Sequence, residues 1–490
     1  MKAQSPSLIW SETFGGHEAR SVQKTNDGGL IIGGIALAPH VHAVDYHGVS
    51  DGFVVKVNSL FEIVWSKCYG SSSAERINEI KPTSDGGYIF VGDKVVPTLG
   101  REFWIVKIDS EGTVIWEKTY GVASFDEAHS VAETDDGHYI VTGLSGNVNN
   151  NSSVNNFGYD DFLTLKIDSQ GELVYMVNHG GPSNDRSYSV VVNSDGTAVV
   201  AGESQSESGE VVSQNGTICA SSFWITKLST KGSIIWAKAF GSDVSGANFF
   251  NTAREIIKTT DGGYAIVGSC NGIFGQNYLK DFYLIKIDSE GNLQWRNTWG
   301  GSGHDTPYSI EQTTDGGYIL AGETFSDDYD VSHNLGSSFN NGWVVKVNST
   351  GELEWQKTIG GTGIDRFYDI IQLNDNDYLA IGDSNSHDFD CIQNTGLSFW
   401  LAKISASTLD SDDFVERDFN IYQSNNGETL NLKSTDEIIF LTIYDSTGKS
   451  IMQKKDQNIQ EVDISLLPSG VYIVRVSTNS DSMNRKFIKL

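Results

Sequence analysis

An alternation of apolar and polar residues returns seven times before residue 405. In the fifth copy, the apolar and β-branched residues gather in four segments, at 254–258, 264–269, 281–288 and 293–299. Short segments with this pattern are typical of β-strands. Glycine-rich turns separate the first segment from the second and the third from the fourth, so each copy is predicted to fold as a four-stranded antiparallel meander.

The turn between the first two segments makes the repetition plain. It reads Thr-Asn-Asp-Gly-Gly at residues 25–29, and related turns begin near residues 83, 134, 193, 259, 313 and 373. Steps of roughly 50 to 65 residues are those of propellers and solenoids. A lone meander cannot cover both of its faces, so the copies must stack, and a closed ring leaves no exposed ends. We therefore predict an all-β chain with a seven-bladed β-propeller over residues 8–405.

The repeat is out of phase with the chain. Residues 8–14 form a lone fourth segment, and the last copy stops after its third segment, at residues 398–404. We expect these two segments to pair in the seventh blade, so that the N-terminal strand closes the propeller. Helix content is expected to be close to nil.

The two ends of the predicted ring differ in their loops. Both tight turns of every blade lie at one end, and long variable segments lie at the other, at residues 35–50, 144–159, 203–221, 323–340 and 383–397. Since variable loops on a rigid scaffold commonly carry function, the long-loop side is the candidate recognition surface.

Five repeats place a carboxylate four residues ahead of a pair formed by Ser, Glu or Asp and then Val or Ile. These candidate ligand-binding residues are Glu75, Asp126, Asp185, Asp305 and Asp365. In a closed ring they are expected around the channel mouth on the long-loop side, where carboxylate oxygens could hold Ca²⁺ or a hydroxyl-rich substrate. The alternative is that they cap turns and pair with neighbouring arginines.

The other recurrent residues are expected to be structural, because a catalytic group needs to occur once and not in every blade. They include the aspartates of the tight turns, a lysine in the third segment, and Trp and Phe residues. No nucleophile elbow, phosphate loop or metalloprotease motif occurs. His40 and His42 lack a recognisable third ligand, so we assign no catalytic residue, cofactor or metal site.

The composition of the chain excludes some classes of binding partner. The 490 residues include 63 acidic and 34 basic side chains, a formal charge of −29, which argues against binding to nucleic acid or anionic membranes. No apolar stretch is long enough to span a membrane. The four cysteines lack the spacing of metal ligands. We expect the protein to be a monomer.

The repeated Asp-Gly-Gly-Tyr and Phe-Trp-x-x-Lys elements resemble those of short bacterial β-propeller repeats, over roughly residues 8–405. The Thr-x-Asp-Gly-Gly turn is also similar to the Asp-box turn of sialidases. These resemblances imply a propeller fold and a type of hairpin turn. They do not imply a function, since propellers include both binding platforms and enzymes.

The pattern changes after the repeats. Residues 406–418 are acidic and polar and read as a linker. Residues 419–490 contain new predicted strands, at 428–433, 438–445, 460–464, 470–476 and 485–490, which favour a small immunoglobulin-like β-sandwich.

Three elements of this tail closely resemble the type A C-terminal sorting domain of the type IX secretion system. They lie at residues 443–449, 462–476 and 486–489, and the matching residues of the sorting signal are Gly448, Gly470, Val471, Tyr472, Lys486 and Lys489. The family's proline-bearing opening is absent from residues 421–432. The resemblance implies the type IX machinery as partner and export to the outer surface of a Gram-negative cell. It also implies tail cleavage with release or anchoring, and a signal peptide that preceded Met1.

Together these features predict a secreted or cell-surface binding propeller, with a glycan or another surface protein as its ligand. The alternative is a polysaccharide-active hydrolase or lyase that uses the acidic channel mouth. A third hypothesis is a purely structural component of the cell surface.

Overall fold

The computed structural model separates the chain into two compact units, Met1–Ser407 and Thr408–Leu490. It describes all residues except 1–5, 14, 40–41, 44, 147–156, 212–220, 242–249, 272–278, 332–333, 335–338, 375, 392–397, 406–419, 424–427, 434–436, 446–449, 457, 478–481 and 490. The predicted linker, 406–418, therefore lies outside the described residues.

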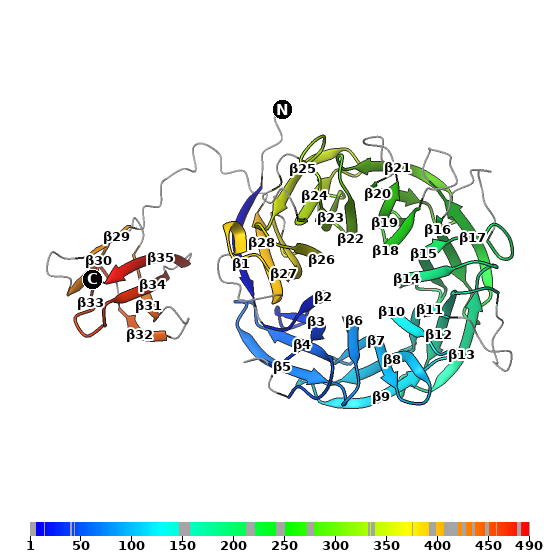
Figure 1. Cartoon of the computed structure of the whole chain (residues 1–490), viewed down its shortest axis with the longest axis horizontal. Coiled ribbons are helices and arrows are strands. Elements are labelled where there is room, and N and C mark those ends of the chain that lie inside the picture. The colour runs from blue at the N-terminus through cyan, green and yellow to red at the C-terminus, as the bar shows by residue number, and fades with distance from the viewer. Residues whose placement is uncertain are drawn as a thin grey trace. The chain divides into compact units, whose positions relative to one another are not determined.

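The first unit contains seven four-stranded antiparallel sheets arranged around a ring (Figure 1). Each sheet is one blade, and in six of them the chain runs from the inner strand to the outer one. The first three blades are β2 (Glu18–Lys24), β3 (Leu30–Ala36), β4 (Asp51–Val57) and β5 (Ile63–Tyr69); β6 (Glu75–Pro82), β7 (Tyr88–Val96), β8 (Gly100–Ile108) and β9 (Val114–Tyr120); and β10 (Asp126–Glu133), β11 (Tyr139–Ser145), β12 (Asp161–Ile167) and β13 (Leu173–His179).

The next three blades follow the same order. They are β14 (Asp185–Val192), β15 (Ala198–Ser204), β16 (Ser222–Leu228) and β17 (Ile234–Phe240); β18 (Thr252–Lys258), β19 (Tyr264–Asn271), β20 (Lys280–Ile287) and β21 (Leu293–Trp299); and β22 (Asp305–Gln312), β23 (Tyr318–Thr324), β24 (Asn341–Val347) and β25 (Leu353–Ile359). The prediction of an all-β propeller is confirmed.

The last sheet joins the two ends of the propeller. It contains β26 (Asp365–Gln372), β27 (Asp377–Ser384), β28 (Ser398–Ser405) and, as its outer strand, β1 (Ser7–Thr13). Strands β1 and β28 are antiparallel, with Ser7 opposite Ser405 and Thr13 opposite Trp400. The predicted pairing of the N-terminal strand with the last repeat is confirmed.

The hydrophobic core lies between neighbouring blades. Strands β3, β4 and β12 are buried along their whole length, as expected for strands covered on both faces. Aromatic rings make many of the blade-to-blade contacts: Phe282 packs on Trp343 at 4.4 Å between ring centroids, and Phe162 on Trp224 at 4.5 Å. The same packing joins the first and last blades, where Phe53 and Phe399 lie 5.1 Å apart.

In five blades the aspartate of the recurrent turn forms an ion pair with the recurrent lysine of the third strand. In the first blade the Asp27 carboxylate accepts hydrogen bonds from Gly29 N, the Thr25 hydroxyl and Lys56 Nζ, the last at 2.8 Å. Gly28 has a φ of 80°, in the left-handed region, and a side chain on Gly29 would collide with Lys56 and the Val57 carbonyl. These contacts support the expected structural role of both recurrent residues.

The second unit contains two sheets. One is formed by β29 (Asn420–Gln423), β30 (Thr429–Lys433) and β33 (Glu461–Asp463), and the other by β32 (Ser450–Lys455), β31 (Phe440–Asp445), β34 (Gly470–Ser477) and β35 (Ser482–Lys489). Leu430 and Val462 from the first sheet share one core with Leu441 and Val474 from the second. Strands β29 and β32 were not predicted from the sequence.

No helix in the described part of the chain is long and apolar enough to cross a membrane. The described residues contain one helical turn, the 3₁₀ segment η1 (Phe389–Cys391).

Candidate ligand site in the propeller channel

All seven inner strands carry the same irregularity. The pairing of each inner strand with its neighbour skips one residue, which is the signature of a β-bulge. The skipped residues are Arg20, Asn78, His129, Tyr188, Arg254, Tyr308 and Tyr368, and we call them the belt. A bulge turns side chains out of the regular alternation, and here it directs the belt residues towards the channel.

Belt residues contact one another around the channel. His129 stacks on Tyr188 at 5.0 Å, and Tyr308 packs on Tyr368 at 5.1 Å. Arg254 lies between two tyrosine rings, 4.7 Å from the Tyr188 centroid and 5.8 Å from that of Tyr308. On the other side of Tyr368, the Arg20 guanidinium lies 5.9 Å from its ring and donates to Asn78 Oδ1 at 2.6 Å. These contacts form a chain of planar side chains along the wall.

The residue after each belt residue ties its blade to the next one. This second set, which we call the ring, consists of Ser21, Glu79, Ser130, Ser189, Glu255, Ser309 and Asp369. Each ring side chain accepts a hydrogen bond from a backbone N–H of the following blade, and the donors are Ile80, Val131, Val190, Ile256, Ile310, Ile370 and Val22. The last bond joins Asp369 to Val22 and so closes the ring.

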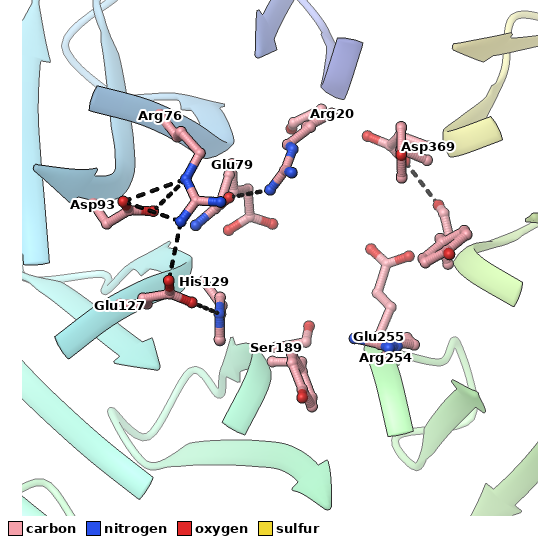
Figure 2. A pocket seen from close by; sticks show the side chains of 16 residues that line it. Arg20, Arg76, Glu79, Asp93, Glu127, His129, Ser189, Arg254, Glu255 and Asp369 are labelled. Atoms are coloured by element: carbon pink, nitrogen blue, oxygen red, sulfur yellow. Dashed lines mark hydrogen bonds and ion pairs between the residues drawn. The ribbon is translucent and has the colours of Figure 1, made fainter. Parts of the chain in front are cut away.

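The belt and the ring enclose a cavity of 310 Å³. Its walls include all seven belt residues, six of the ring residues, and Arg76, Asp93 and Glu127 (Figure 2). These residues lie in the first part of the inner strands or beside it, towards the long-loop end of the channel. The cavity thus offers aromatic faces, hydrogen-bond donors and carboxylate acceptors in one small space.

One wall is a connected cluster of charges. Arg76 bridges Asp93 at 3.1 Å and Glu127 at 3.0 Å, and Glu127 lies 3.6 Å from His129 (Figure 2). Burial raises the pKa of Asp93 to about 6, although Arg76 opposes this shift. Burial also acts to raise the pKa of Glu127, but His129 and Arg76 outweigh it and the pKa is lowered.

The opposite wall contains a pair of buried carboxyl groups. Burial raises the pKa values of both Glu255 and Asp369, and the charge of Asp369 raises that of Glu255 further. Lys81 forms an ion pair with Glu79 at 3.0 Å, and Glu79, Glu255 and Asp369 together outweigh burial and raise the pKa of Lys81. The Glu255–Asp369 pair therefore resists carrying two full negative charges.

The five sequence-predicted carboxylates lie beside the cavity and are absent from its lining. Each is the first residue of an inner strand and is fully buried. Asp305 accepts hydrogen bonds from Gly301 N, Ser326 Oγ and Thr324 Oγ1, and Asp365 is bound in the same way by Gly361, Ser386 and Ser384. These bonds match the turn-capping alternative. A ligand role for Glu75, Asp126, Asp185, Asp305 and Asp365, and Ca²⁺ binding among them, stays a prediction.

Within the described residues, no three or more His, Cys, Asp and Glu side chains are grouped so that they could hold a metal ion. Cys68, Cys270 and Cys391 are buried free thiols, and burial raises the pKa of Cys68 to about 12. Such thiols are poor nucleophiles and ligands. Cys219 lies outside the described residues.

In the second unit, the sorting-signal residues lie on two paired strands. Gly470, Val471 and Tyr472 begin β34, Lys486 and Lys489 lie in β35, and Gly470 pairs with Lys489. The buried Tyr472 hydroxyl donates to the Pro468 carbonyl at 2.8 Å, and Lys489 Nζ donates to the Ser465 carbonyl at 3.0 Å. Gly448 lies outside the described residues.

Comparison with known proteins identifies this second unit. Residues 421–490 match the secretion system C-terminal sorting domain family. The chain carries a type IX sorting domain. This sorting domain indicates export by the type IX secretion system, and the resemblance found in the sequence is confirmed. No curated protein matches the sequence.

Several solved structures resemble the chain. The extracellular domain of the hybrid two-component system BT4673 from B. thetaiotaomicron has 11% identity and a TM-score of 0.45, and the match covers 99% of this chain and 59% of that one. The WD40 domain of Pan2 from Neurospora crassa has 11% identity and a TM-score of 0.46, with 83% and 98% covered. PorZ, a surface component of the type IX secretion system of Porphyromonas gingivalis, has 12% identity and a TM-score of 0.28, with 96% and 81% covered.

The buried carboxyl groups predict how the stability of the propeller depends on pH. Burial raises the pKa values of Glu102, Asp161 and Asp383 to about 7. A raised folded-state pKa gives stability that is complete below the unfolded-state value of about 4 and is lost as the pH rises through about 7. We expect the melting temperature to fall by several degrees between pH 5 and pH 9, measured by calorimetry at constant ionic strength.

Asp383→Asn tests one of these groups, because both Asp383 carboxylate oxygens are buried without hydrogen-bond partners. The variant is expected to lose less stability than the natural chain over the same pH range. The exposed Glu207 serves as the control position, and Glu207→Gln should keep the original pH dependence. Equal slopes for all three chains would contradict the assignment.

Proposed function

We propose that this protein is an exported binding protein whose channel cavity takes a small hydroxyl-rich ligand, such as the end of a glycan chain. The cavity carries the proposal, because its belt combines three tyrosines with Arg20, Asn78, His129 and Arg254 in a built pocket. Sugar rings present apolar faces and a rim of hydroxyl groups, and they need aromatic surface, donors and acceptors together. A volume of 310 Å³ lies at the small end of ligand sites, about 300 to 1,000 Å³, and favours a short saccharide.

The tyrosines suit this role because their hydroxyls are held outside the stacking faces. Tyr308 donates to Glu323 at 2.9 Å, and Arg366 donates to the Tyr368 hydroxyl at 3.3 Å. Burial raises the pKa of Tyr188 to about 12 and raises those of Tyr308 and Tyr368, so all three rings are neutral at physiological pH. A rigid neutral ring offers contact area at a low cost in conformational entropy.

Export of the protein supports a ligand that lies outside the cell. The sorting domain indicates export, and we propose display at the outer surface or release into the medium after the tail is removed. We also propose that the tail folds as an immunoglobulin-like sandwich and that the protein is a monomer. Another surface protein on the long-loop side is the competing ligand.

The polysaccharide-active enzyme remains a second candidate because of one feature. Glu255 and Asp369 are neighbouring carboxyl groups in the cavity wall, and glycoside hydrolases act with a pair of carboxyl groups. Both pKa values are raised here, which suits a general acid, whereas the second carboxyl group of such a pair stays ionised. Both also accept backbone hydrogen bonds in the ring, from Ile310 and Val22. That structural use explains their burial without catalysis, so we place binding first.

Tyr308→Ala is expected to weaken glycan binding by at least about tenfold, because it removes a central stacking surface from the cavity. A glycan array with the purified full chain identifies the ligand, and titration calorimetry gives the affinities. Asn78→Trp, which fills the same cavity, should cause a similar loss. Hydrolysis or lyase products are assayed in parallel, and turnover that disappears in Glu255→Gln would establish the enzyme instead.

Tyr159→Ala is the matched control, since Tyr159 is a tyrosine of the long-loop side that is 65% exposed. It is expected to leave the affinity unchanged. Binding that survives both cavity variants but is lost in Tyr159→Ala would place the ligand on the loops and overturn the channel site.

Deletion of residues 419–490 is expected to stop export but leave the propeller folded, because the two units have separate cores. Immunoblots of cells, cell surface and medium from a host with a type IX system measure the distribution. Leu466→Ala changes a residue of the same unit that is 92% exposed and should be exported normally. Normal export of the shortened chain would contradict the role given to the sorting domain.

A further inference from the structure

Arg254 differs from the other arginines near the channel. Five of these form ion pairs: Arg20 with Glu18 at 2.6 Å, Arg76 with Asp93 at 3.1 Å, Arg101 with Asp93 at 3.5 Å, Arg186 with Asp160 at 2.7 Å, and Arg366 with Glu323 at 3.1 Å. Arg254 forms no ion pair with any carboxylate of the described chain, and its Nε atom is buried without a hydrogen-bond partner. Leaving a partly buried cation unpaired costs free energy, so the position calls for an explanation.

The guanidinium of Arg254 is nevertheless well held. It lies 4.7 Å from the Tyr188 ring centroid and 5.8 Å from that of Tyr308, and cation–π contacts of this kind fix a planar group while they leave its N–H donors unused. Arg254 lines the cavity, across from the Arg76–Asp93–Glu127 cluster (Figure 2). The cavity therefore contains a positioned cation whose donors are available to a ligand.

The surroundings add to the positive potential at this point. Lys280, at the start of β20, has a pKa lowered by burial and by the charge of Arg254. In a chain of net charge −29, an anionic ligand is repelled nearly everywhere. Arg254 in the cavity wall, with Lys280 near it but outside the cavity lining, is a local exception.

The rest of the wall limits the charge of the anion. The same 310 Å³ cavity is lined by five carboxyl groups, so a dianion such as phosphate would face them at close range; they are Glu79, Asp93, Glu127, Glu255 and Asp369. A carboxylate carries a single charge, and its two oxygens match the planar fork of a guanidinium. A carboxylated ligand therefore fits better than a phosphorylated one.

We propose that the ligand is an acidic sugar, a uronic acid residue whose carboxylate binds Arg254 while its hydroxyl groups meet the carboxylates of the cavity wall. This inference rests on the proposed function, because it names the substrate class of the same site. It also assigns Arg254 as the residue that discriminates acidic from neutral sugars.

The test compares uronic acids with their methyl esters, which have nearly the same shape but no charge. Titration calorimetry with the full chain is expected to show glucuronic or galacturonic acid oligomers binding at least about tenfold more tightly than the esters. Arg254→Gln should bring the ratio of acid affinity to ester affinity close to one, and Arg254→Lys should restore part of this preference. Arg186→Gln, at an ion-paired arginine outside the cavity lining, should keep the full preference.

The outcomes separate the two levels of the proposal. Equal binding of acid and ester by the natural chain would overturn the acidic sugar and leave a neutral glycan site. Inorganic phosphate that competes as strongly as the uronic acid would also overturn it, in favour of a general anion site. Absence of binding to acid and ester alike would overturn the acidic sugar, and absence of binding to every sugar of the glycan array would overturn the proposed function itself.

Discussion

The propeller depends on the hydrogen bonds that join each inner strand to the next blade. An inner strand is the edge of its sheet, so its channel-facing backbone N–H groups have no strand partner, and buried donors of this kind are costly if left unpaired. The ring side chains satisfy one such donor in every blade. The carboxyl members of the ring accept these bonds at 2.6, 2.7 and 2.8 Å, and the serines accept them at 3.2 or 3.3 Å, so the carboxyl groups make the shorter bonds.

The same arrangement shapes the candidate site. Because the ring residue must reach the neighbouring blade, the strand bulges just before it, and the bulged residue is free to vary and faces the channel. Six of the ring residues line the cavity together with the whole belt. A repeated structural bond thus creates seven neighbouring positions at which any side chain can be placed, and three tyrosines and two arginines occupy five of them. The sorting domain has its own core and adds the route to the cell exterior.

Much of the fold could be predicted from the sequence, because the Thr-x-Asp-Gly-Gly turns and strand patterns are local signals. The candidate site could not. A regular strand sends neighbouring residues to opposite faces, so alternation cannot place both Tyr188 and Ser189 on the channel wall, as the bulge does. The recurrent Ser-Val and Glu-Ile pairs did mark the position, and the variable residue just before each pair was the available signal. The spacing of residues along the sequence also could not show that the Asp305 side chain points away from the channel and accepts a hydrogen bond from the turn at Gly301.

Amide hydrogen exchange tests this account most directly, because it reports on the seven inner-edge N–H groups one by one. The amides of the seven ring donors are expected to be protected like those inside a sheet, and Ser130→Ala is expected to expose the Val190 amide alone. Fast exchange of these amides in the natural chain, or unchanged protection of Val190 in the variant, would contradict the claim that ring side chains join the blades.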